Sequence, residues 1–317
     1  MVNPVARLAS EVTPPKEAYL DGKWVAWENA NVHISTHALH YGTGVFAGIR
    51  AYWNEDEKQS YIFRLDDHIE RLFNSCQYFF MKLKETPKEV RNVVIESVRR
   101  NKFQRDVYIR PLAFKHLNPG IIGVNPTGTS DALLVFAVGF GDYLPTDKGL
   151  HVCCSSFQQL SDNALPRRGK ISGAYANSAL ASSEAKFNGF DDAIMLTRDG
   201  WVSEGTAMNL FLVRDERVIT PSLNSSLLEG ITRRTILALC QDLGIPTEER
   251  LVQRSELYIC DEAFYCGTGV QVAPIRMIDH RELREPKLQI TKRIQKAYFD
   301  IVRGKNKKYK DWLTPVY

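Results

Sequence analysis

The sequence predicts an α+β protein built from two domains. A chain of 317 residues exceeds what one hydrophobic core usually organises, so two cores are expected. The first half is rich in strand-like segments with two helical segments among them, whereas the second half alternates helices and strands in another order. A glycine-rich, polar stretch at 139–150 separates the halves and is the best linker candidate. We therefore expect a smaller domain at 1–138 and a larger one at 151–317.

Turn and capping signals define the elements of the first half. Asp21-Gly22 is typical of a tight hairpin turn between two strands. Asp66 is expected to cap a helix that runs to about Phe79. A second helix begins at Thr86, because Thr86-Pro87-Lys88-Glu89 forms a capping box with proline at the first helical position. The expected strands are 18–20, 23–27, 48–53, 61–65, 107–114 and 131–138.

The second half contains three expected helices. The first spans 172–187 and is rich in small side chains. The second opens within 228–232 and ends near Gly244, and the third spans 291–302, with Gly304 as its C-terminal stop. The expected strands are 192–197, 201–203, 209–213, 217–220, 249–252 and 263–266.

Composition excludes several classes of function. The formal net charge of +4 is small, and part of it comes from a lysine-rich run at 305–310, so no nucleic-acid-binding face is indicated. The six cysteines form no C-x-x-C pair, which favours a reducing compartment and argues against zinc. No apolar run reaches membrane-spanning length, and the N-terminus lacks the apolar region of a signal peptide. We expect a cytoplasmic protein without a nucleic-acid or membrane partner.

Lys170 is the most informative residue of the chain. It lies in a basic, Gly- and Ser-rich turn, 165–175, that opens the helix of small side chains. An amine becomes a useful nucleophile or base when burial or cationic neighbours lower its pKa, and pyridoxal phosphate captures such an amine as a Schiff base. Arg167 and Arg168 fit that requirement. Taken alone, however, a loop lysine is more commonly a solvated surface residue.

Other positions suit parts of the same cofactor. Glu204 lies at an expected strand end, and a carboxylate there can keep a pyridine nitrogen protonated. Gly230-Ile231-Thr232 opens a helix, whose unpaired N–H groups and dipole suit a phosphate, although Thr232 can equally be a simple cap. Arg71 points away from the apolar face of its helix and can reach a phosphate or lie exposed in solvent.

Two further patterns carry less weight. Gly42-Thr43-Gly44-Val45-Phe46-Ala47 matches a dinucleotide-binding fingerprint, but a strand rather than a helix is expected after it. His33, His37 and His40 have a metal-like spacing, but there is no sign of a helix that aligns them, and no acidic or cysteine ligand completes a set. A turn with hydrogen-bonded histidines is the preferred interpretation.

Read together, these motifs resemble the fold-type IV pyridoxal-phosphate enzymes, and most of all the branched-chain amino-acid aminotransferases. The resemblance covers about Ala18 to Tyr298. It implies a small α+β domain followed by a larger domain with a pseudo-barrel of strands, as in D-amino-acid aminotransferase, and a cofactor between them. It rests on the motifs R-G-K-I-S-G-A-Y at Lys170, S-E-G-T-A-M-N-L-F at Glu204, L-E-G-I-T-R at Gly230, C-G-T-G at Thr268, the stretch 37–50 and Tyr108-Ile109-Arg110.

The resemblance implies a role for each site residue. Lys170 would hold pyridoxal phosphate as a Schiff base and move the substrate's Cα proton, while Glu204 would bond the pyridine nitrogen and Tyr175 the phenolic oxygen. The residues implied for the phosphate are Arg71, Gly230, Ile231, Thr232 and Thr268. The residues implied for the substrate are Phe46, Tyr41 from a neighbouring subunit, Tyr108, Arg110, Tyr143, Thr268 and Gly269.

The implied reaction is transamination between branched-chain L-amino acids (leucine, isoleucine and valine) and 2-oxoglutarate. A borrowed Tyr41 implies a homo-oligomer, either a dimer or a multiple of dimers. The family often has Glu where this chain has Ala47, and an acidic residue where it has Met208, so a polar network near the pocket is expected to be missing.

Several alternatives stay open from the sequence. One is another fold-type IV transaminase, acting on R-amines or D-amino acids; the stretch 63–69 looks like one in the R-selective enzymes, whereas Tyr108-x-Arg110 favours the branched-chain family. A fold-type IV lyase is a further possibility. From other classes come a nicotinamide-dependent oxidoreductase that uses Gly42 and Gly44, and a non-catalytic protein that binds a cofactor.

Overall fold

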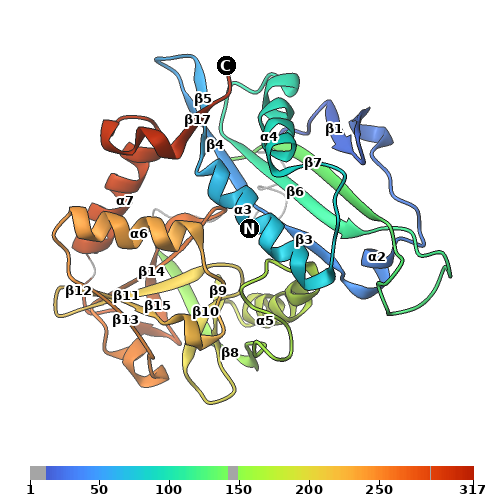
Figure 1. Ribbon diagram of the computed structural model, residues 1–317. Helices are drawn as coiled ribbons and strands as arrows, with labels where there is room; N and C mark the ends of the chain where they lie inside the picture. The colour runs from blue at the N-terminus through green and yellow to red at the C-terminus, as the bar shows by residue number, and fades with distance from the viewer. Residues whose placement is uncertain (1–11, 142–148, 286) are drawn as a thin grey trace. The chain divides into compact units, whose positions relative to one another are not determined.

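The computed structural model of the chain describes residues 12–141, 149–285 and 287–317 (Figure 1). These residues form two compact units, and the chain passes between them more than once. The first unit contains the described residues up to 141 together with 169–173 and 301–317, and the second contains 149–168 and 174–300. The predicted division at 139–150 stays a prediction, and most of that stretch lies outside the described residues.

An 8-stranded antiparallel sheet forms the centre of the first unit. Its strand order is β17-β5-β4-β6-β7-β1-β2, with β3 paired to β6. The predicted hairpin is confirmed: Asp21 (φ 43°) and Gly22 (φ 91°) both adopt positive φ, as the favoured two-residue hairpin turn requires. The strands are β1 (Glu17–Leu20), β2 (Lys23–Ala26), β3 (Gly44–Phe46), β4 (Ile49–Asn54), β5 (Gln59–Phe63), β6 (Val107–Lys115), β7 (Asp131–Gly139) and β17 (Leu313–Pro315).

The longest helix of this unit, α4 (Pro87–Asn101), covers the sheet at β6, β7 and β1. It begins at the predicted capping box, in which the Thr86 hydroxyl accepts the Glu89 N–H and the Glu89 carboxylate accepts the Thr86 N–H. Its buried apolar face contains Val90, Val94 and Val98, which have the i, i+4, i+8 spacing of one helix side.

Helix α3 (Leu65–Cys76) differs from the prediction at its start. Asp66 is inside the first turn, and the cap is Arg64, whose backbone is left-handed with φ 50° and makes no side-chain cap bond. The helix ends at Cys76 and continues as a single 3-10 turn over Gln77–Phe79. Asp66 was the wrong cap because tertiary packing of Leu65, buried to 1% exposure, starts the helix two residues earlier.

A 9-stranded mixed sheet forms the centre of the second unit, in the order β10-β9-β8-β15-β14-β11-β12-β13, with β16 paired to β15. The pairs β8–β9, β8–β15 and β12–β13 are parallel, and the other pairs are antiparallel. The strands are β8 (Leu150–Gln158), β9 (Asp192–Leu196), β10 (Val202–Gly205), β11 (Asn209–Arg214), β12 (Arg217–Pro221), β13 (Thr247–Arg250), β14 (Glu262–Gly267), β15 (Gln271–Ile278) and β16 (Arg281–Glu282).

Three helices accompany this sheet (Figure 1). Helix α5 (Tyr175–Phe187) packs on β8 and β9 and is the crossover between these parallel strands. Helix α6 (Ile231–Asp242) packs on β14 and β13, and Gly244 (φ 66°) follows its end, as predicted. Helix α7 (Gln289–Val302) leads the chain back to the first unit. Along the described chain, further short 3-10 segments lie at Trp27–Asn29, Ser172–Ala174, Leu223–Ser225, Arg254–Tyr258 and Lys307–Trp312, the last of which has a kink at Tyr309.

The six cysteines carry free thiols, most of them buried. Burial raises the pKa of the Cys76 and Cys240 thiols to about 12, so both stay protonated and pack as small apolar side chains. Within the described ranges, no helix has the length and apolar character needed to cross a membrane.

Candidate active site

The backbone of Lys170 is held by two elements of the first unit. Its carbonyl accepts the Phe46 N–H of β3 at 3.0 Å, and its N–H donates to the Ser75 hydroxyl of α3 at 3.2 Å. The next residue, Ile171, forms a β-bridge with Val45. Lys170 therefore follows a turn in sequence but is fixed against a strand and a helix, which is unlike a solvated loop lysine.

The side chain of Lys170 lies beside an aromatic ring. Its Nζ is 5.1 Å from the centre of the Phe46 ring, and the Arg110 guanidinium carbon is 4.4 Å from the same centre. Phe46 is buried to 7% exposure. An amine, an apolar ring and a second cation thus meet at one place in the first unit.

Tyr108 and Arg110 point from the same side of β6, since alternate residues of a strand share a face. The Arg110 guanidinium donates to the Tyr108 hydroxyl at 2.8 Å. A side chain at Gly48 would overlap the same hydroxyl, so only glycine leaves room for Tyr108 in this position. The Tyr108 ring also packs against Phe140, at 5.8 Å between ring centres.

The region around Tyr41 corrects one expectation. Residues His37–Tyr41 form the short helix α2, which the sequence did not predict. The histidines are hydrogen-bonded, as expected: His37 Nδ1 contacts the Thr43 hydroxyl at 2.7 Å, and His40 Nε2 contacts the Ile34 carbonyl at 2.8 Å. Tyr41 ends the helix, with its ring 4.6 Å from that of His37 and with 38% of its surface exposed.

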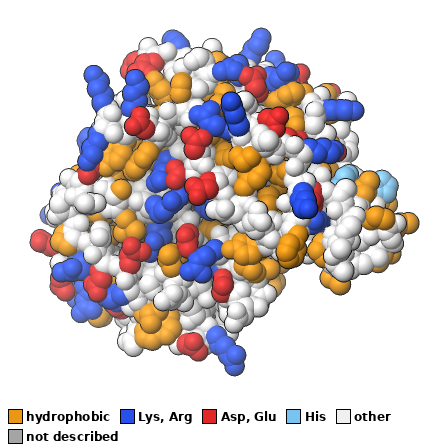
Figure 2. All heavy atoms as spheres, viewed as in Figure 1, with side chains coloured by type: hydrophobic (Ala, Val, Ile, Leu, Met, Phe, Trp, Pro, Cys, Tyr) orange, Lys and Arg blue, Asp and Glu red, His pale blue; other side chains and the backbone are white. Residues whose placement is uncertain are grey.

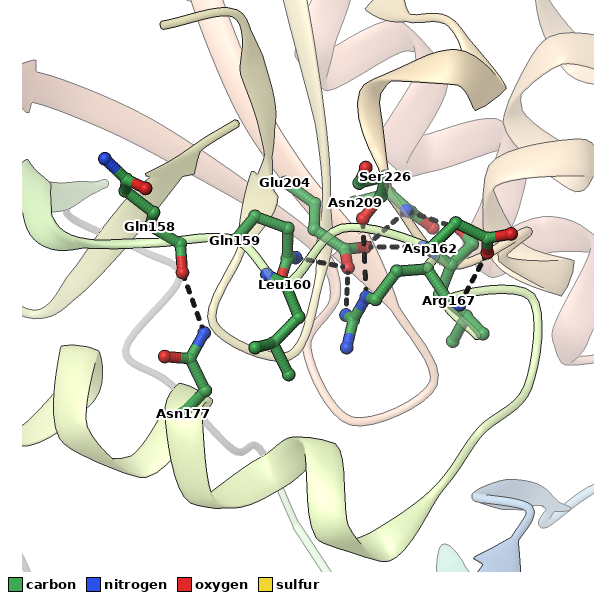
Figure 3. A network of polar contacts seen from close by, with 10 residues as sticks. Gln158, Gln159, Leu160, Asp162, Arg167, Asn177, Glu204, Asn209 and Ser226 are labelled. Carbon is green, nitrogen blue, oxygen red and sulfur yellow. Dashed lines mark hydrogen bonds and ion pairs between the residues drawn. The ribbon is translucent and has the colours of Figure 1, made fainter. Parts of the chain in front are cut away.

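In the second unit, Glu204 is a buried carboxylate surrounded by donors (Figure 3). Its Oε1 accepts from Gln159 Nε2 at 3.1 Å and from Arg167 Nη2 at 2.8 Å. Its Oε2 accepts from Asn209 Nδ2 at 3.0 Å and from the Leu228 N–H at 3.2 Å. Such contacts favour the charged form of the side chain.

The helix start at Gly230 is built around Asn209. Gly230 is the N-cap of α6, so no side chain there can cap the amides of Ile231 and Thr232. Thr232 is inside the first turn and is therefore not the cap. A Cβ at Gly230 would overlap Asn209 Oδ1, and Asn209 Nδ2 donates to the Leu228 carbonyl at 2.9 Å. Asn209 thus connects Glu204 to the segment that leads into α6.

The two arginines before Lys170 have carboxylate partners of their own. Arg167 pairs with Glu204, and Arg168 Nε is 2.8 Å from Glu229 Oε1. Neither arginine therefore stands beside Lys170 as an uncompensated cation. The contacts of Arg167, Gln159 and Ser75 were not predicted, because each joins residues far apart in the sequence. The contact of Asn209 was missed although it lies only five positions from Glu204.

The remaining candidate residues lie as follows. Arg71 is half-buried on α3, and its carbonyl accepts the Ser75 hydroxyl at 2.7 Å. Tyr175 begins α5, and Thr268 and Gly269 form the turn between β14 and β15. Tyr143 lies outside the described residues.

Ala47 and Met208 are both buried, at 1% and 5% exposure, and Met208 belongs to the apolar core of the second unit. An apolar side chain thus fills the place where the family pattern has an acid. After Gly42, the chain forms β3 and then β4, whereas a dinucleotide fingerprint requires a helix there.

Comparison with known proteins identifies the family. The family described as amino-transferase class IV matches residues 44–278. A probable branched-chain-amino-acid aminotransferase from Aquifex aeolicus (strain VF5) is 43% identical over 305 residues, covering 95% of this chain and 96% of that protein.

Two solved structures are similar over nearly the whole chain. The branched-chain aminotransferase from the thermophilic archaeon Thermoproteus uzoniensis, solved with norvaline, has a TM-score of 0.90 and 41% identity, covering 96% of this chain and all of that one. A second branched-chain amino acid aminotransferase, complexed with N-(5'-phosphopyridoxyl)-L-glutamate, has a TM-score of 0.90 and 36% identity over the same share of this chain. The expected fold class is thereby confirmed, and the chain belongs to the class IV aminotransferases, in their branched-chain amino-acid aminotransferase branch.

Proposed function

We propose that the chain transaminates the branched-chain L-amino acids leucine, isoleucine and valine against 2-oxoglutarate, using pyridoxal phosphate. The observation that carries the proposal is the arrangement at Phe46, with the Lys170 amine 5.1 Å and the Arg110 guanidinium 4.4 Å from its ring centre. The space beside the Lys170 amine therefore has an apolar ring and a cation, which a substrate side chain can contact. A transaminase of this kind needs both, because an aliphatic and an acidic side chain must enter in turn.

The residues of the second unit fit the cofactor. Glu204 is held as an acceptor by donors on both oxygens, which suits a protonated ring nitrogen. The Gly230 helix start offers the amides of Ile231 and Thr232, which suit a phosphate. We propose that Tyr175 bonds the ring hydroxyl and that Arg71 and Thr268 contribute to phosphate binding. When bound, pyridoxal phosphate supplies a ring that withdraws electrons from the substrate's Cα.

The chain's own residues then bind the substrate and move a proton. Lys170 Nζ would take the proton from the substrate's Cα and carry it towards the cofactor, which is general acid–base catalysis. Tyr108 and the amides of Thr268 and Gly269 hold the substrate's α-carboxylate. Arg110, with Tyr143 and a neighbouring subunit's Tyr41, pairs with the side-chain carboxylate of glutamate, whereas Phe46 packs against a branched aliphatic side chain.

Two relatives support this choice of substrates. One is solved with norvaline, an aliphatic amino acid, and the other with a phosphopyridoxyl adduct of L-glutamate. We infer that glutamate gives its amino group to the enzyme and leaves as 2-oxoglutarate. A branched-chain 2-oxo acid then enters and takes the amino group, so nitrogen is conserved over the two halves.

A homo-oligomer, a dimer or a multiple of dimers, is part of the proposal. Apolar side chains and histidines gather on the surface of the first unit around α2 (Figure 2). Two segments, 32–41 and 116–124, meet there, because the His37 N–H donates to the His116 carbonyl at 2.8 Å. Exposed apolar patches of this kind mark interaction surfaces, and Tyr41 lies on this one. The exposed apolar residues of the two segments are Val32, Ile34, Leu39, Tyr41, Leu117, Ile121, Ile122 and Val124. A cytoplasmic location stays a prediction.

A substrate panel tests the proposal. The full-length protein, loaded with pyridoxal phosphate, is assayed with 2-oxoisocaproate and either L-glutamate, D-glutamate or an R-amine as the donor. We expect turnover with L-glutamate alone, and a loss of about a thousandfold or more in Lys170→Ala for both halves of the reaction. Faster turnover of the R-amine or the D-amino acid would refute the substrate assignment, and an active Lys170→Ala would refute the mechanism.

A further inference from the structure

Glu204 has a cation partner in the protein itself. The Arg167–Glu204 pair is nearly buried, with side-chain exposures of 11% and 5%. Figure 3 shows the Arg167 side chain reaching from the turn after β8 to the Glu204 carboxylate on β10. Both residues belong to the second unit, so the pair is part of one compact body.

The turn that presents Arg167 is fixed at two further points. The Arg167 backbone N–H donates to Asp162 Oδ1 at 3.0 Å, which closes the turn. The Arg167 Nε donates to the Ser226 carbonyl at 3.3 Å. The guanidinium therefore contacts the carboxylate and a backbone carbonyl at once. This rigid, two-sided placement is what a planar guanidinium provides and a lysine ammonium does not.

Removal of the cation would change the chemistry of Glu204. A carboxylate buried without a charge partner is costly, and it responds by taking up a proton. Gln159 and Asn209 are neutral donors, so they orient the carboxyl group without balancing its charge. A neutral carboxylic acid cannot stabilise a protonated ring nitrogen as an anion does.

We infer that Arg167 is a positioning residue for the cofactor's ring nitrogen: it holds Glu204 as an oriented anion, so that the nitrogen is bound in its protonated form. This inference rests on the proposed role of Glu204. Arg167 acts through Glu204, and it is not assigned a contact with the cofactor or the substrate.

The test compares two ligands that differ in one atom. Pyridoxal phosphate and its 1-deaza analogue, in which C–H replaces the ring nitrogen, are bound to full-length protein freed of cofactor, and both dissociation constants are measured by equilibrium dialysis. We expect the wild type to prefer pyridoxal phosphate by about tenfold or more, as a charge-assisted hydrogen bond provides. In Arg167→Met the preference should fall to about threefold or less, with the affinity for the analogue little changed.

Arg168→Met is the matched control, because it removes the neighbouring arginine, whose pair with Glu229 is exposed at 51% and 40%. It should keep the wild-type preference. Arg167→Lys should restore part of the preference, since it returns the charge without the planar fork. In a Glu204→Gln background, Arg167→Met should have no further effect on the preference.

The outcomes separate the inference from the role it rests on. Suppose that the wild type prefers pyridoxal phosphate, that Glu204→Gln loses this preference and that Arg167→Met keeps it. Glu204 then binds the ring nitrogen, but the role inferred for Arg167 is wrong. If the wild type shows no preference, Glu204 does not bind the nitrogen, and both assignments fall. If Arg167→Met does not fold, Arg167→Lys carries the test: a preference as large as that of the wild type overturns the inference, because the planar guanidinium would then not be needed to orient Glu204.

Discussion

The Ser75 hydroxyl connects Lys170 to helix α3. It accepts the Lys170 N–H at 3.2 Å and donates to the Arg71 carbonyl at 2.7 Å. The residue proposed to move the proton and the arginine proposed for the phosphate are thus linked through one buried side chain of the first unit. A positional error at Lys170 would alter its distance to the substrate's Cα, on which the rate depends steeply.

Ser75→Ala is therefore expected to reduce kcat by about tenfold, with KM for leucine changed by about twofold or less. Its unfolding free energy should fall by about 1 kcal/mol, the usual net worth of a hydrogen bond. Ser97→Ala is the control, since Ser97 is a buried serine of α4 that donates to the Val94 carbonyl at 2.7 Å within its own helix. It should lose similar stability and keep its kcat. Equal kcat values for the two variants would disprove the link.

Gly169 is expected to be intolerant of a side chain. A Cβ there would lie 2.7 Å from Cε2 of Tyr78, which is closer than real Cβ atoms come to other atoms. Gly169→Ala should lower the unfolding free energy by about 1–3 kcal/mol, as overpacking does. In a Tyr78→Ala background, Gly169→Ala should lower the unfolding free energy by less. Thermal or urea unfolding of the wild type, the two single variants and the double variant measures this coupling. Gly120→Ala, where the nearest atom is 3.5 Å away, should change little. Strictly additive effects at Gly169 and Tyr78 would show that the overlap is not the cause.

Arg110 is expected to discriminate between the two substrate types. Because its guanidinium is the proposed partner of the glutamate side-chain carboxylate, Arg110→Met should raise KM for L-glutamate by about 10- to 100-fold. KM for leucine should rise by only about threefold, since the Phe46 wall remains. Steady-state kinetics with both amino acids measures this difference, and the second substrate is the internal control. An equal rise for both would assign Arg110 to the common α-carboxylate instead.

Local signals explain why much of the fold was predictable. The Asp21-Gly22 turn and the Thr86 to Glu89 capping box depend on neighbours in sequence, and both form as predicted. Strands β8 and β15 were missed. In β15 Pro274 lacks the N–H that a central strand uses, and in β8 Cys153 to Ser156 give no clear alternation of apolar and polar residues.

The candidate site shows the same difference between local and long-range features. Motifs around Lys170, Glu204 and Gly230 could be located from sequence, because each is a short local pattern. The Arg167–Glu204 pair joins residues 37 positions apart, and the Ser75–Lys170 bond joins residues 95 positions apart. Such contacts depend on the packing of strands and turns, so one sequence alone does not predict them.

Asp192 provides a pH-dependent contribution to stability. It is buried on β9, where its Oδ1 accepts the Thr206 hydroxyl at 2.7 Å. Burial raises the pKa of its carboxyl group from 3.8 to about 6, against the opposing effect of the Thr206 hydrogen bond. The folded protein therefore binds this proton more tightly than the unfolded chain does. Stability from this group is greatest below about pH 4, is lost as the pH rises towards 6, and is constant above that.

Asp192→Asn removes this titration and keeps an oxygen that can accept the Thr206 hydroxyl. The unfolding free energy of Asp192→Asn minus that of the wild type should rise by up to about 3 kcal/mol from pH 4 to pH 7, because the wild type loses stability over this range and each pKa unit corresponds to about 1.4 kcal/mol. Urea unfolding at a series of pH values gives the difference curve. Asp199→Asn, in an exposed turn, is the control for the loss of one surface carboxylate. A difference curve for Asp192→Asn that does not differ from that of the control would mean that burial on β9 does not raise the pKa of Asp192.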